Sequence, residues 1–540
     1  MPKPTVSGIP EQRSPGPRAP AGLAVGTLVA GCFAVCLAQI GIATPATPNG
    51  LFQSDLDPVG SQLTWISDAF LLPVAVLELT FGVLGDLFGR KRLLVAGAGL
   101  MAVGEAVAAA ASGVHMLWVG QALAGLGAAA LFPTSLAMLA AGTRTHDQRA
   151  KVIAIWAALL STGGFLAPLL GGITGTYGSW RWAFVVVAVL AALSALASAW
   201  LADNSSAPEG RSLDIGGQVT IGIGLFALLY GVIQAPTDGW GSVGVVVAFV
   251  VAAVCLVLFV AVERRARSPL LRLDLFTNRG FAVASAVAVV GMFSFLGTCY
   301  ATSIRLGPVQ HQSPMRTAVA FLMLNGVTIF LTPVTARLLA RVAPRWVLSG
   351  GFVLMAAGDF LAATLPVGDT ALTSLIVPLG LVGVGFSFAV SSITATAVNT
   401  VPVHLAGMAS ATTSLLRDFG FTLGPAVIGA VALGRAGTAF TSALAGSSLP
   451  GSVKAAAGEV AAAGGPLAVN SVPPDSPPGH AAALAVQALG HGYAIGFTVC
   501  GCAALLSCVL TVLALRGGRP GETVATADEE LPPEAPTARP

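Results

Sequence analysis

Residues Gly82–Leu94 combine charged and small side chains at a spacing that could form a charged turn between two helices. The segment reads GVLGDLFGRKRLL, with Asp86 ahead of three consecutive cations, Arg90, Lys91 and Arg92, and it lies between two long apolar runs. Basic residues beside a membrane span mark its cytoplasmic end, and an aspartate here can pair with a cation or cap a helix N-terminus. The simpler interpretation is a positive signal that only orients the spans.

Acidic residues inside apolar runs form a second set of candidate functional residues. Such residues are costly in lipid and usually face the interior of a helix bundle, so each is a candidate functional site. A carboxyl group at that depth can bind a proton at neutral pH, which is the physical basis of proton coupling. The alternative for each is a hydrogen bond between helices or a side chain that reaches the membrane edge. The candidates are Asp68, Glu78, Glu105, Asp359 and Asp418, the last directly after Arg417.

Two of these acids share a predicted helix without sharing a face. Glu78 follows Asp68 by ten residues, which turns it about 80° away at 3.6 residues per turn. We therefore expect that Asp68 and Glu78 do not both face one cavity. Arg417 and Asp418 are adjacent, so a local ion pair or an anchor at the membrane interface is the alternative for them.

Composition shows that these residues belong to a membrane protein. Hydrophobic residues make up 55% of the 540 residues and charged residues only 9%, with a mean hydropathy of +0.83. A soluble domain has about 25% charged residues, and a membrane span needs about 20 apolar ones. Fourteen such spans are predicted, near residues 22–45, 62–84, 93–112, 116–140, 151–174, 181–202, 215–235, 241–262, 281–304, 317–340, 346–366, 371–397, 406–434 and 490–515.

The distribution of cations predicts the orientation. With the N-terminus inside, 21 of the 27 Lys and Arg residues fall in inner segments and 5 in outer segments, and Arg417 lies in a span. Cations stay on the cytoplasmic side, so both termini are expected there. The net charge of +3 is small and says nothing about nucleic acid, and no nucleic-acid partner is expected. The seven cysteines all fall in predicted spans and the six histidines are scattered, which predicts no metal site, no cofactor and no membrane-embedded enzyme.

An internal repeat predicts how the spans are arranged. GLGAAALFPTS from Gly125 matches GLVGVGFSFAVSS from Gly380 at an offset of 255, and Arg90 and Arg345 share that offset. We expect an N-terminal tail (1–21), a six-helix bundle (22–202), two inserted spans with a linker (203–280), a second six-helix bundle (281–515) and a disordered tail (516–540). The long outer segment 435–489 is rich in Ala and Gly, and we expect a disordered or loosely packed loop, with a lid as the alternative.

The fifth predicted span has a face of small residues that contains a helix breaker. Small residues let helix backbones approach closely in lipid, and a proline in a membrane helix can act as a bend. Ordinary helix packing is the alternative. The residues of this face are Gly163, Gly164, Ala167, Pro168, Gly171 and Gly172.

From about residue 25 to 515 the chain resembles the fourteen-span drug:H⁺ antiporter branch of the major facilitator superfamily. The resemblance rests on TWISDAFLL, the turn at 82–94, GQALAGLGAAALFPTSLAML, the fifth-span face with SWRWAF after it, and AGMASATTSLLRDFG. It implies an all-α polytopic fold of two six-helix pseudo-repeats plus two inserted helices. It also implies that the turn is a gating loop and the fifth-span face an antiporter motif, with Ala167 where the family has glycine. The gating-loop residues would be Gly82, Asp86, Gly89, Arg90, Lys91 and Arg92.

The same resemblance implies a function. It implies a multi-pass protein of the cell membrane that works as a monomer, with both termini cytoplasmic. This protein would export hydrophobic or amphipathic drugs or antibiotics by proton antiport with alternating access, and so confer resistance. Its substrate cavity should lie near the bilayer midplane between the halves. Candidate cavity residues are Gln121, Phe132, Phe293 and Phe386.

Two departures from the family pattern leave an alternative open. Gln121 stands where the family's fourth span usually has an arginine, and the first span, in LAQIGIATPATP, has no acidic residue. A neutral amide cannot stabilise a carboxylate as a guanidinium does, so any coupling must depend on other carboxyl groups. The alternative function on the same fold is a proton-independent facilitator or an importer of a small metabolite.

Overall fold

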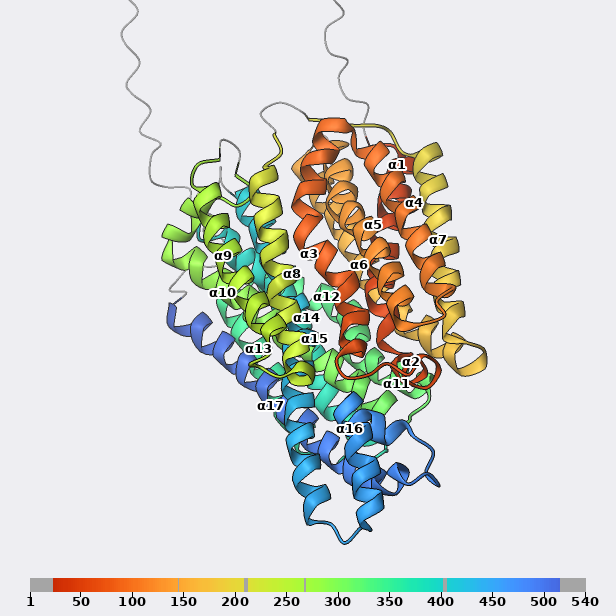
Figure 1. The fold of residues 1–540 in the computed structure, drawn as a ribbon. Coiled ribbons are helices and arrows are strands. Elements are labelled where there is room, and N and C mark those ends of the chain that lie inside the picture. Colours follow the sequence, from red (N-terminus) through yellow and green to blue (C-terminus); the bar gives the residue numbers. More distant parts are fainter. Residues whose placement is uncertain (1–22, 144, 208–211, 267–268, 402–405, 515–540) are drawn as a thin grey trace, which may run out of the picture.

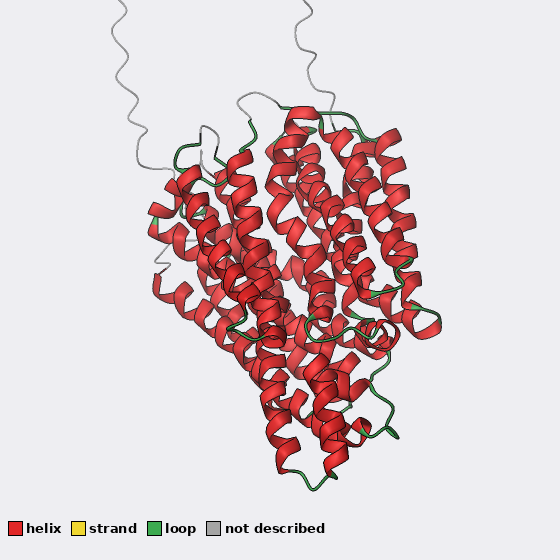
Figure 2. Ribbon diagram, in the orientation of Figure 1, coloured by secondary structure: helices red, strands yellow, loops and turns green. Residues whose placement is uncertain are grey.

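The computed structural model describes residues 23–143, 145–207, 212–266, 269–401 and 406–514. All regular elements in these ranges are helices (Figures 1 and 2). Fourteen helical segments are long and apolar enough to cross a membrane, which confirms the predicted number of spans. The expected tails, 1–21 and 516–540, lie outside the described residues. Because the number of spans is even, α1 begins and α17 ends at the same face of the helix bundle. We call this face the terminal face and the opposite one the distal face.

The first half contains six spans and two short distal elements. A single residue, Gly89, separates the second span from the third, and a short helix at the distal face follows the first span. The elements are α1 (Val25–Ala43), η1 (Thr44–Ala46), α2 (Asn49–Leu56), α3 (Gln62–Phe88), α4 (Arg90–Ala109), α5 (Val114–Ala141), α6 (His146–Tyr177) and α7 (Trp180–Leu201).

The inserted pair and the second half follow. The inserted helices are α8 (Ile215–Asp238) and α9 (Val243–Glu263), and η2 (Leu273–Thr277) leads into the second half. In that half the first two spans contain short π-helical segments, η3 and η4. Its elements are α10 (Arg279–Ile304), η3 (Arg305–Val309), α11 (Pro314–Phe321), η4 (Leu322–Gly326), α12 (Val327–Leu339), α13 (Pro344–Thr364), α14 (Thr373–Val398), α15 (Ala406–Gly446), α16 (Gly451–Ser471), η6 (Pro478–Ala481) and α17 (Ala482–Ala514).

The two halves have the same internal packing. In the first half α4 packs against α5 and α7, and α1 packs against α6 and α7. In the second half α13 packs against α14 and α17, and α10 packs against α15 and α17. Close crossings also correspond, since Gly97 approaches Gly127 between α4 and α5 while Gly351 approaches Gly385 between α13 and α14. A side chain at any of these glycines would collide with backbone, so small residues set the distance between the helices.

The inserted helix α8 lies along the seam between the halves. It contacts α3 of the first half and α15 of the second, while α9 packs on α8. Figure 1 shows α8 between the two groups of helices. Leu229 and Ile233 of α8 form one apolar cluster with Ala426 of α15 and with Trp65 and Leu72 of α3. The inserted pair is therefore part of the packed structure between the halves.

The expectation of an irregular outer loop at 435–489 was wrong. α15 continues to Gly446, α16 covers Gly451–Ser471, and α17 begins at Ala482. These helices extend beyond the other spans at the bottom of Figure 1. Alanine has the highest helix propensity, and Phe440, Leu444, Ala457 and other apolar residues of this hairpin bury one another. The segment is therefore a packed helical hairpin.

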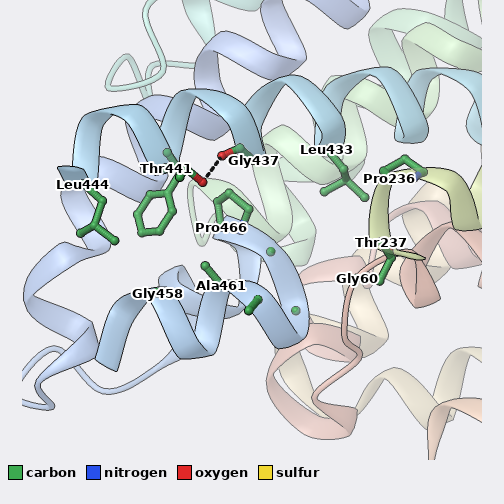
Figure 3. Close-up of a pocket in the computed structure, with 14 residues that line it drawn as sticks. Gly60, Pro236, Thr237, Leu433, Gly437, Thr441, Leu444, Gly458, Ala461 and Pro466 are labelled. Atoms are coloured by element: carbon green, nitrogen blue, oxygen red, sulfur yellow. Dashed lines mark hydrogen bonds between the residues drawn. The ribbon is translucent and has the colours of Figure 1, made fainter. Parts of the chain in front are cut away.

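A cavity of about 290 Å³ lies where this hairpin meets the distal end of α8. Figure 3 shows Leu433, Leu444 and Pro466 around it, with Pro236 and Thr237 of α8 at one end. The Thr441 hydroxyl, which also lines it, donates to the Gly437 carbonyl at 2.9 Å. The cavity is lined by small and apolar residues, and it lies at the distal end instead of at the midplane where we expected the substrate.

Candidate functional site

The two halves are joined at the distal face by direct polar contacts. Asn49 Nδ2 of α2 donates to Ser303 Oγ of α10 at 2.8 Å, and the backbone N–H of Met315 donates to Thr176 Oγ1 at 3.0 Å. Thr64 of α3 and Tyr300 of α10 share a hydrogen bond of 2.7 Å. These contacts link α2, α3 and α6 of the first half to α10 and α11 of the second, so the halves are closed against each other at this face.

The fifth-span face of small residues takes part in this closure. Gly163 of α6 packs on α1 at Cys36, and Ala167 is fully buried. Gly172 faces the other half, where a Cβ would lie 2.5 Å from Ala318 Cβ and 3.2 Å from the Pro314 carbonyl oxygen. The motif therefore provides close contacts both within the first half and across to α11. Pro168 is buried inside the continuous helix α6.

The charged turn is held by a buried ion pair and by backbone bonds. Asp86, in the last turn of α3, accepts from Arg90 Nη2 at 2.7 Å and from Nε at 3.1 Å. Gly89 between the helices has φ +103°, a conformation that favours glycine. The predicted pairing of Asp86 with a cation is thus confirmed.

The turn also binds the chain that follows α7. The Arg90 N–H donates to the Ser205 carbonyl at 2.9 Å, and the Ala207 N–H donates to the Asp86 carbonyl at 3.0 Å. The Lys91 N–H donates to Asn204 Oδ1 at 3.3 Å. Gly82 lies against Pro133 of α5, and Arg92 is exposed. The turn therefore fixes the end of the first half to the linker that leads to α8.

Glu105 and Asp359 occupy equivalent places in the two halves. Each lies 15 residues after the first residue of its helix, α4 or α13, and both side chains are fully buried. The Asp359 carboxyl group accepts from Thr298 Oγ1 at 2.6 Å and from Ser294 Oγ at 3.4 Å. Neither oxygen of Glu105 has a hydrogen-bond partner in the described structure. Asp359 therefore fits the alternative of a satisfied bond between helices, and Glu105 does not.

Asp68 is a fully buried carboxyl group beside the contact between the halves. Both of its oxygens lack a hydrogen-bond partner in the described structure. It follows Thr64, which hydrogen-bonds to Tyr300 of the second half, by one helical turn. Burial without a partner makes a negative charge on Asp68 very costly, so this carboxyl group has the surroundings of a site that binds a proton.

Glu78 and Asp418 are brought together although they belong to different halves. Glu78 of α3 lies near Asp418 of α15, and Asp418 Oδ1 accepts from Arg417 Nε at 3.3 Å. We had treated the two acids as separate candidates, because nothing in the linear sequence pairs them. Only the packing of α3 along α15 does so.

The candidate cavity residues are not gathered in one place. Gln121 is fully buried, and neither atom of its amide has a partner in the described structure. Phe132 packs against an apolar cluster of the first half, whereas Phe386 stacks on Phe295 in the second at 3.5 Å between ring centroids. Phe293 packs against a third cluster that joins both halves. That these four residues line one pocket remains a prediction.

The buried position of Arg305, one of the five cations counted in outer segments, was not predicted from the sequence. Its side chain is only 5% exposed, and its guanidinium donates to the carbonyls of Ala362, Leu365 and Pro366 at 3.3, 2.9 and 2.8 Å. These carbonyls end α13, where the helix leaves acceptors without partners. The buried cation therefore caps α13 near the contact between the halves.

The sequence model of the Major Facilitator Superfamily matches residues 29–425. The chain belongs to the major facilitator superfamily. Relatives of this superfamily member include the "Multidrug resistance protein Stp" of Mycobacterium tuberculosis, 32% identical over 68% of each chain. The "Tetracenomycin C resistance and export protein" of Streptomyces glaucescens is 29% identical over 95% of each chain. The "Puromycin resistance protein pur8" of Streptomyces alboniger is 31% identical over 80% of this chain and 86% of that one.

Solved structures show the same fold. A bacterial homologue of the human lysosomal transporter Spinster, in an inward-facing and unoccupied conformation, has a TM-score of 0.63 and 14% identity, covering 91% of this chain and 96% of that one. The POT family transporter PepTSo has a TM-score of 0.59 and 15% identity, covering 92% of this chain and 98% of that one. This superfamily member is therefore a multi-pass membrane protein with the facilitator fold.

Proposed function

We propose that this superfamily member is a secondary active transporter that exports hydrophobic or amphipathic drugs or antibiotics in exchange for protons. Support for the substrate class comes from relatives named for multidrug, tetracenomycin C and puromycin resistance, one of which matches 95% of the chain. The observation that carries the proton coupling is Asp68, a buried carboxyl group without a partner beside the contact between the halves.

The coupling step follows from the surroundings of Asp68. With the distal face closed, the carboxyl group is fully buried and is neutral, because a charge there would be unpaired. When the halves rock apart at the distal face, water reaches the carboxyl group and the proton can exchange. The proton therefore binds more tightly in one state than in the other. A ligand with such a difference in affinity shifts the equilibrium between the two states.

The faces of the membrane, the state of assembly and the location in the cell follow from proton-coupled export by this fold. The terminal face has most of the cations and is the cytoplasmic one, so both termini are cytoplasmic and the distal hairpin is outside the cell. The transporter works as a monomer in the cell membrane, with the lipid bilayer, protons and the exported compound as its partners.

A substitution at Gly172 tests whether the close contact between the halves governs transport. Gly172→Ala should slow ethidium export about tenfold, equivalent to about 1.4 kcal/mol, because the new Cβ would overlap Ala318 of α11. Initial efflux rates from cells with matched protein levels measure the effect. Gly164→Ala is the control in the same helix, since its Cβ would lie 3.8 Å from the nearest atom. Equal rates for the two variants would show that this close contact does not govern transport.

A substitution at Asp86 tests whether the charged turn acts as a gating loop. Asp86→Ala should lower the turnover number about tenfold while changing KM less than about twofold, since the pair with Arg90 holds the turn and touches no substrate. Concentration-dependent efflux gives both constants. Lys151→Ala removes an exposed charge near the start of α6, at the same face but outside the turn, and should leave both constants unchanged. An Asp86→Ala variant with normal turnover contradicts a role in gating.

One observation favours the alternative function. Gln121 replaces the family's arginine and is buried without a partner, so a proton-independent facilitator would also explain this position. In such a protein Asp68 would be a structural residue.

Efflux measured with and without a proton gradient distinguishes the two functions. Cells that express the protein are loaded with ethidium, puromycin and other dyes and antibiotics, and efflux is followed before and after an uncoupler is added. We expect export of at least one compound against its gradient and loss of that export with the uncoupler. Downhill movement that the uncoupler leaves unchanged would instead establish a facilitator.

A further inference from the structure

A stripe of exposed apolar residues on the inserted helix α9 ends in an arginine. Val243, Val250 and Val257 are all more than half exposed. Arg264 follows Val257 by seven residues, as Val257 follows Val250, and seven residues make nearly two helical turns. Arg264 keeps helical backbone angles, with φ −64° and ψ −19°, so its side chain lies on the same face as the three valines. The apolar surface of α9 therefore has a cation at its terminal end.

The length of this stripe places Arg264 at the level of the lipid headgroups. Arg264 lies 21 residues after Val243, the first residue of α9, which is about 31 Å at the rise of an α-helix. The hydrocarbon core of a bilayer is about 30 Å thick. A lipid whose acyl chain lies beside Val257 therefore has its phosphate close to the Arg264 guanidinium.

Arg264 also lines a cleft of about 500 Å³ between the end of α9 and η2. The second cation of this cleft is Arg272, and Pro269 and Leu273 provide apolar walls. Arg264 forms no ion pair among the described residues. Arg272 donates to Asp274 from Nε at 3.1 Å and from Nη2 at 2.5 Å. A guanidinium has five N–H donors, so three donors of Arg272 are left for a further acceptor.

The two acidic residues of the cleft are bound by other groups. Asp274 pairs with Arg272, and Glu263 Oε2 accepts from the Leu271 N–H at 3.3 Å. Glu263 is also only 4% exposed. The segment 263–279 contains five arginines against these two acids, a net charge of +3. The surroundings of the cleft therefore attract an anion.

A phosphate group fits the two arginines of the cleft, because a guanidinium can donate two parallel hydrogen bonds to phosphate oxygens. A free phosphate ion would meet only the charges and would leave the valine stripe unused. A phospholipid with a net negative headgroup uses both, since its phosphate meets the arginines while an acyl chain covers the valines. Cations that directly follow a membrane helix attract anionic lipids. Charge and apolar surface together therefore favour an anionic phospholipid.

We propose that Arg264 and Arg272 form a binding site for an anionic phospholipid, with the phosphate in the cleft and an acyl chain along Val257 and Val250. The bound lipid connects the end of α9 to η2, which packs on α10, and so holds the inserted pair beside the second half. This site goes beyond the proposed export and does not depend on it.

Lipid binding to the purified protein tests this site without any transport. Delipidated protein in detergent micelles is mixed with dioleoyl-phosphatidylglycerol, with dioleoyl-phosphatidylcholine or with inorganic phosphate. Binding is measured by the shift in Tm and by native mass spectrometry of the retained lipid. Phosphatidylglycerol should raise Tm and stay bound, whereas the other two additions should do neither. An equal effect of phosphatidylcholine would show that charge does not select the lipid, and an equal effect of inorganic phosphate would show a site for a soluble anion; either result overturns the proposal.

Variants of the cleft locate the binding. Arg264→Ala combined with Arg272→Ala should weaken phosphatidylglycerol binding about twentyfold. The matched control combines Lys151→Ala with Arg341→Ala, two exposed cations of the same face, and should bind like wild type. Asp274→Asn frees Arg272 from its ion pair and should tighten binding about threefold, whereas a change that only loosened the linker would weaken it.

The exposed Arg264 provides a milder variant if the double variant does not fold. Arg264→Ala alone removes a side chain without an ion pair among the described residues and should weaken binding about fivefold. Wild-type affinity for phosphatidylglycerol in the arginine variants, or weaker binding in Asp274→Asn, would show that these cations only orient the span.

Discussion

Asp68→Asn is expected to abolish export against a concentration gradient while leaving downhill exchange in place. The asparagine has nearly the same shape but cannot exchange a proton, so the equilibrium between the two states no longer responds to proton concentration. We expect efflux driven by the pH gradient to fall about a hundredfold. Initial rates of ethidium and puromycin efflux, in cells and in proteoliposomes with and without the gradient, measure this effect.

The control for this variant is an acid that is only partly buried at the same face. Asp369→Asn removes a carboxylate from the distal segment between α13 and α14, where Asp369 is partly exposed, and should export normally. The pKa of Asp369 is held below its usual value by a hydrogen bond from Ser374, so it stays ionised at neutral pH. Normal dependence on the pH gradient in Asp68→Asn would exclude Asp68 as the coupling site.

Arg305→Met is expected to destabilise the second half more than other single changes of a distal arginine. The substitution keeps much of the side-chain volume and removes the donors to three carbonyls at the end of α13. Leaving buried acceptors without partners should cost about 2–4 kcal/mol. For a chain of this size, that corresponds to a fall in Tm of about 3 °C. Thermal unfolding of the purified protein in detergent gives the value.

Arg316→Met is the matched control for that prediction. Arg316 is exposed and donates to a single carbonyl, that of Thr370, at 2.8 Å. Exposed polar contacts contribute little, so Tm should change by less than about 1 °C. If both arginine variants unfold at the same temperature, burial of the Arg305 guanidinium does not stabilise the end of α13.

The spans and their repeat could be predicted because both leave local signals. A membrane helix needs a long apolar run, and hydropathy alone located all fourteen. Matching segments such as those at Gly125 and Gly380 predicted two similar halves, and the packing of α4 with α7 and of α13 with α17 repeats accordingly. The pairing of Asp86 with Arg90 could also be predicted, since the residues lie four apart around one turn.

Contacts between the halves could not be predicted, because they depend on how whole bundles meet. Glu78 and Asp418 are far apart in the sequence, and neither has a local feature that indicates the other. Gly172 gave a signal for close packing but none for its partner on α11. The distal hairpin was missed because a segment rich in Ala and Gly is compatible with a loop, and its helices are stabilised by burying Phe440 and its neighbours.

The structure also separates the buried acids by their surroundings. Asp359 has two hydroxyl donors and fits a structural role within the second half. Asp68 on α3 and Glu105 on α4 have no partner for either carboxyl oxygen in the described structure. Of these two, Asp68 lies beside the contact between the halves, which is where a proton can change the balance between two states of the halves.

Proton movement and drug movement are proposed to be one process carried out by two rocking halves. Simultaneous recording of ethidium and proton flux in proteoliposomes of the purified wild-type protein tests this coupling. We expect that an imposed pH gradient drives ethidium uphill, that an ethidium gradient alone moves protons the opposite way, and that Asp68→Asn loses both effects. Ethidium movement at equal rates with and without the gradient, with no accompanying proton flux, would contradict it.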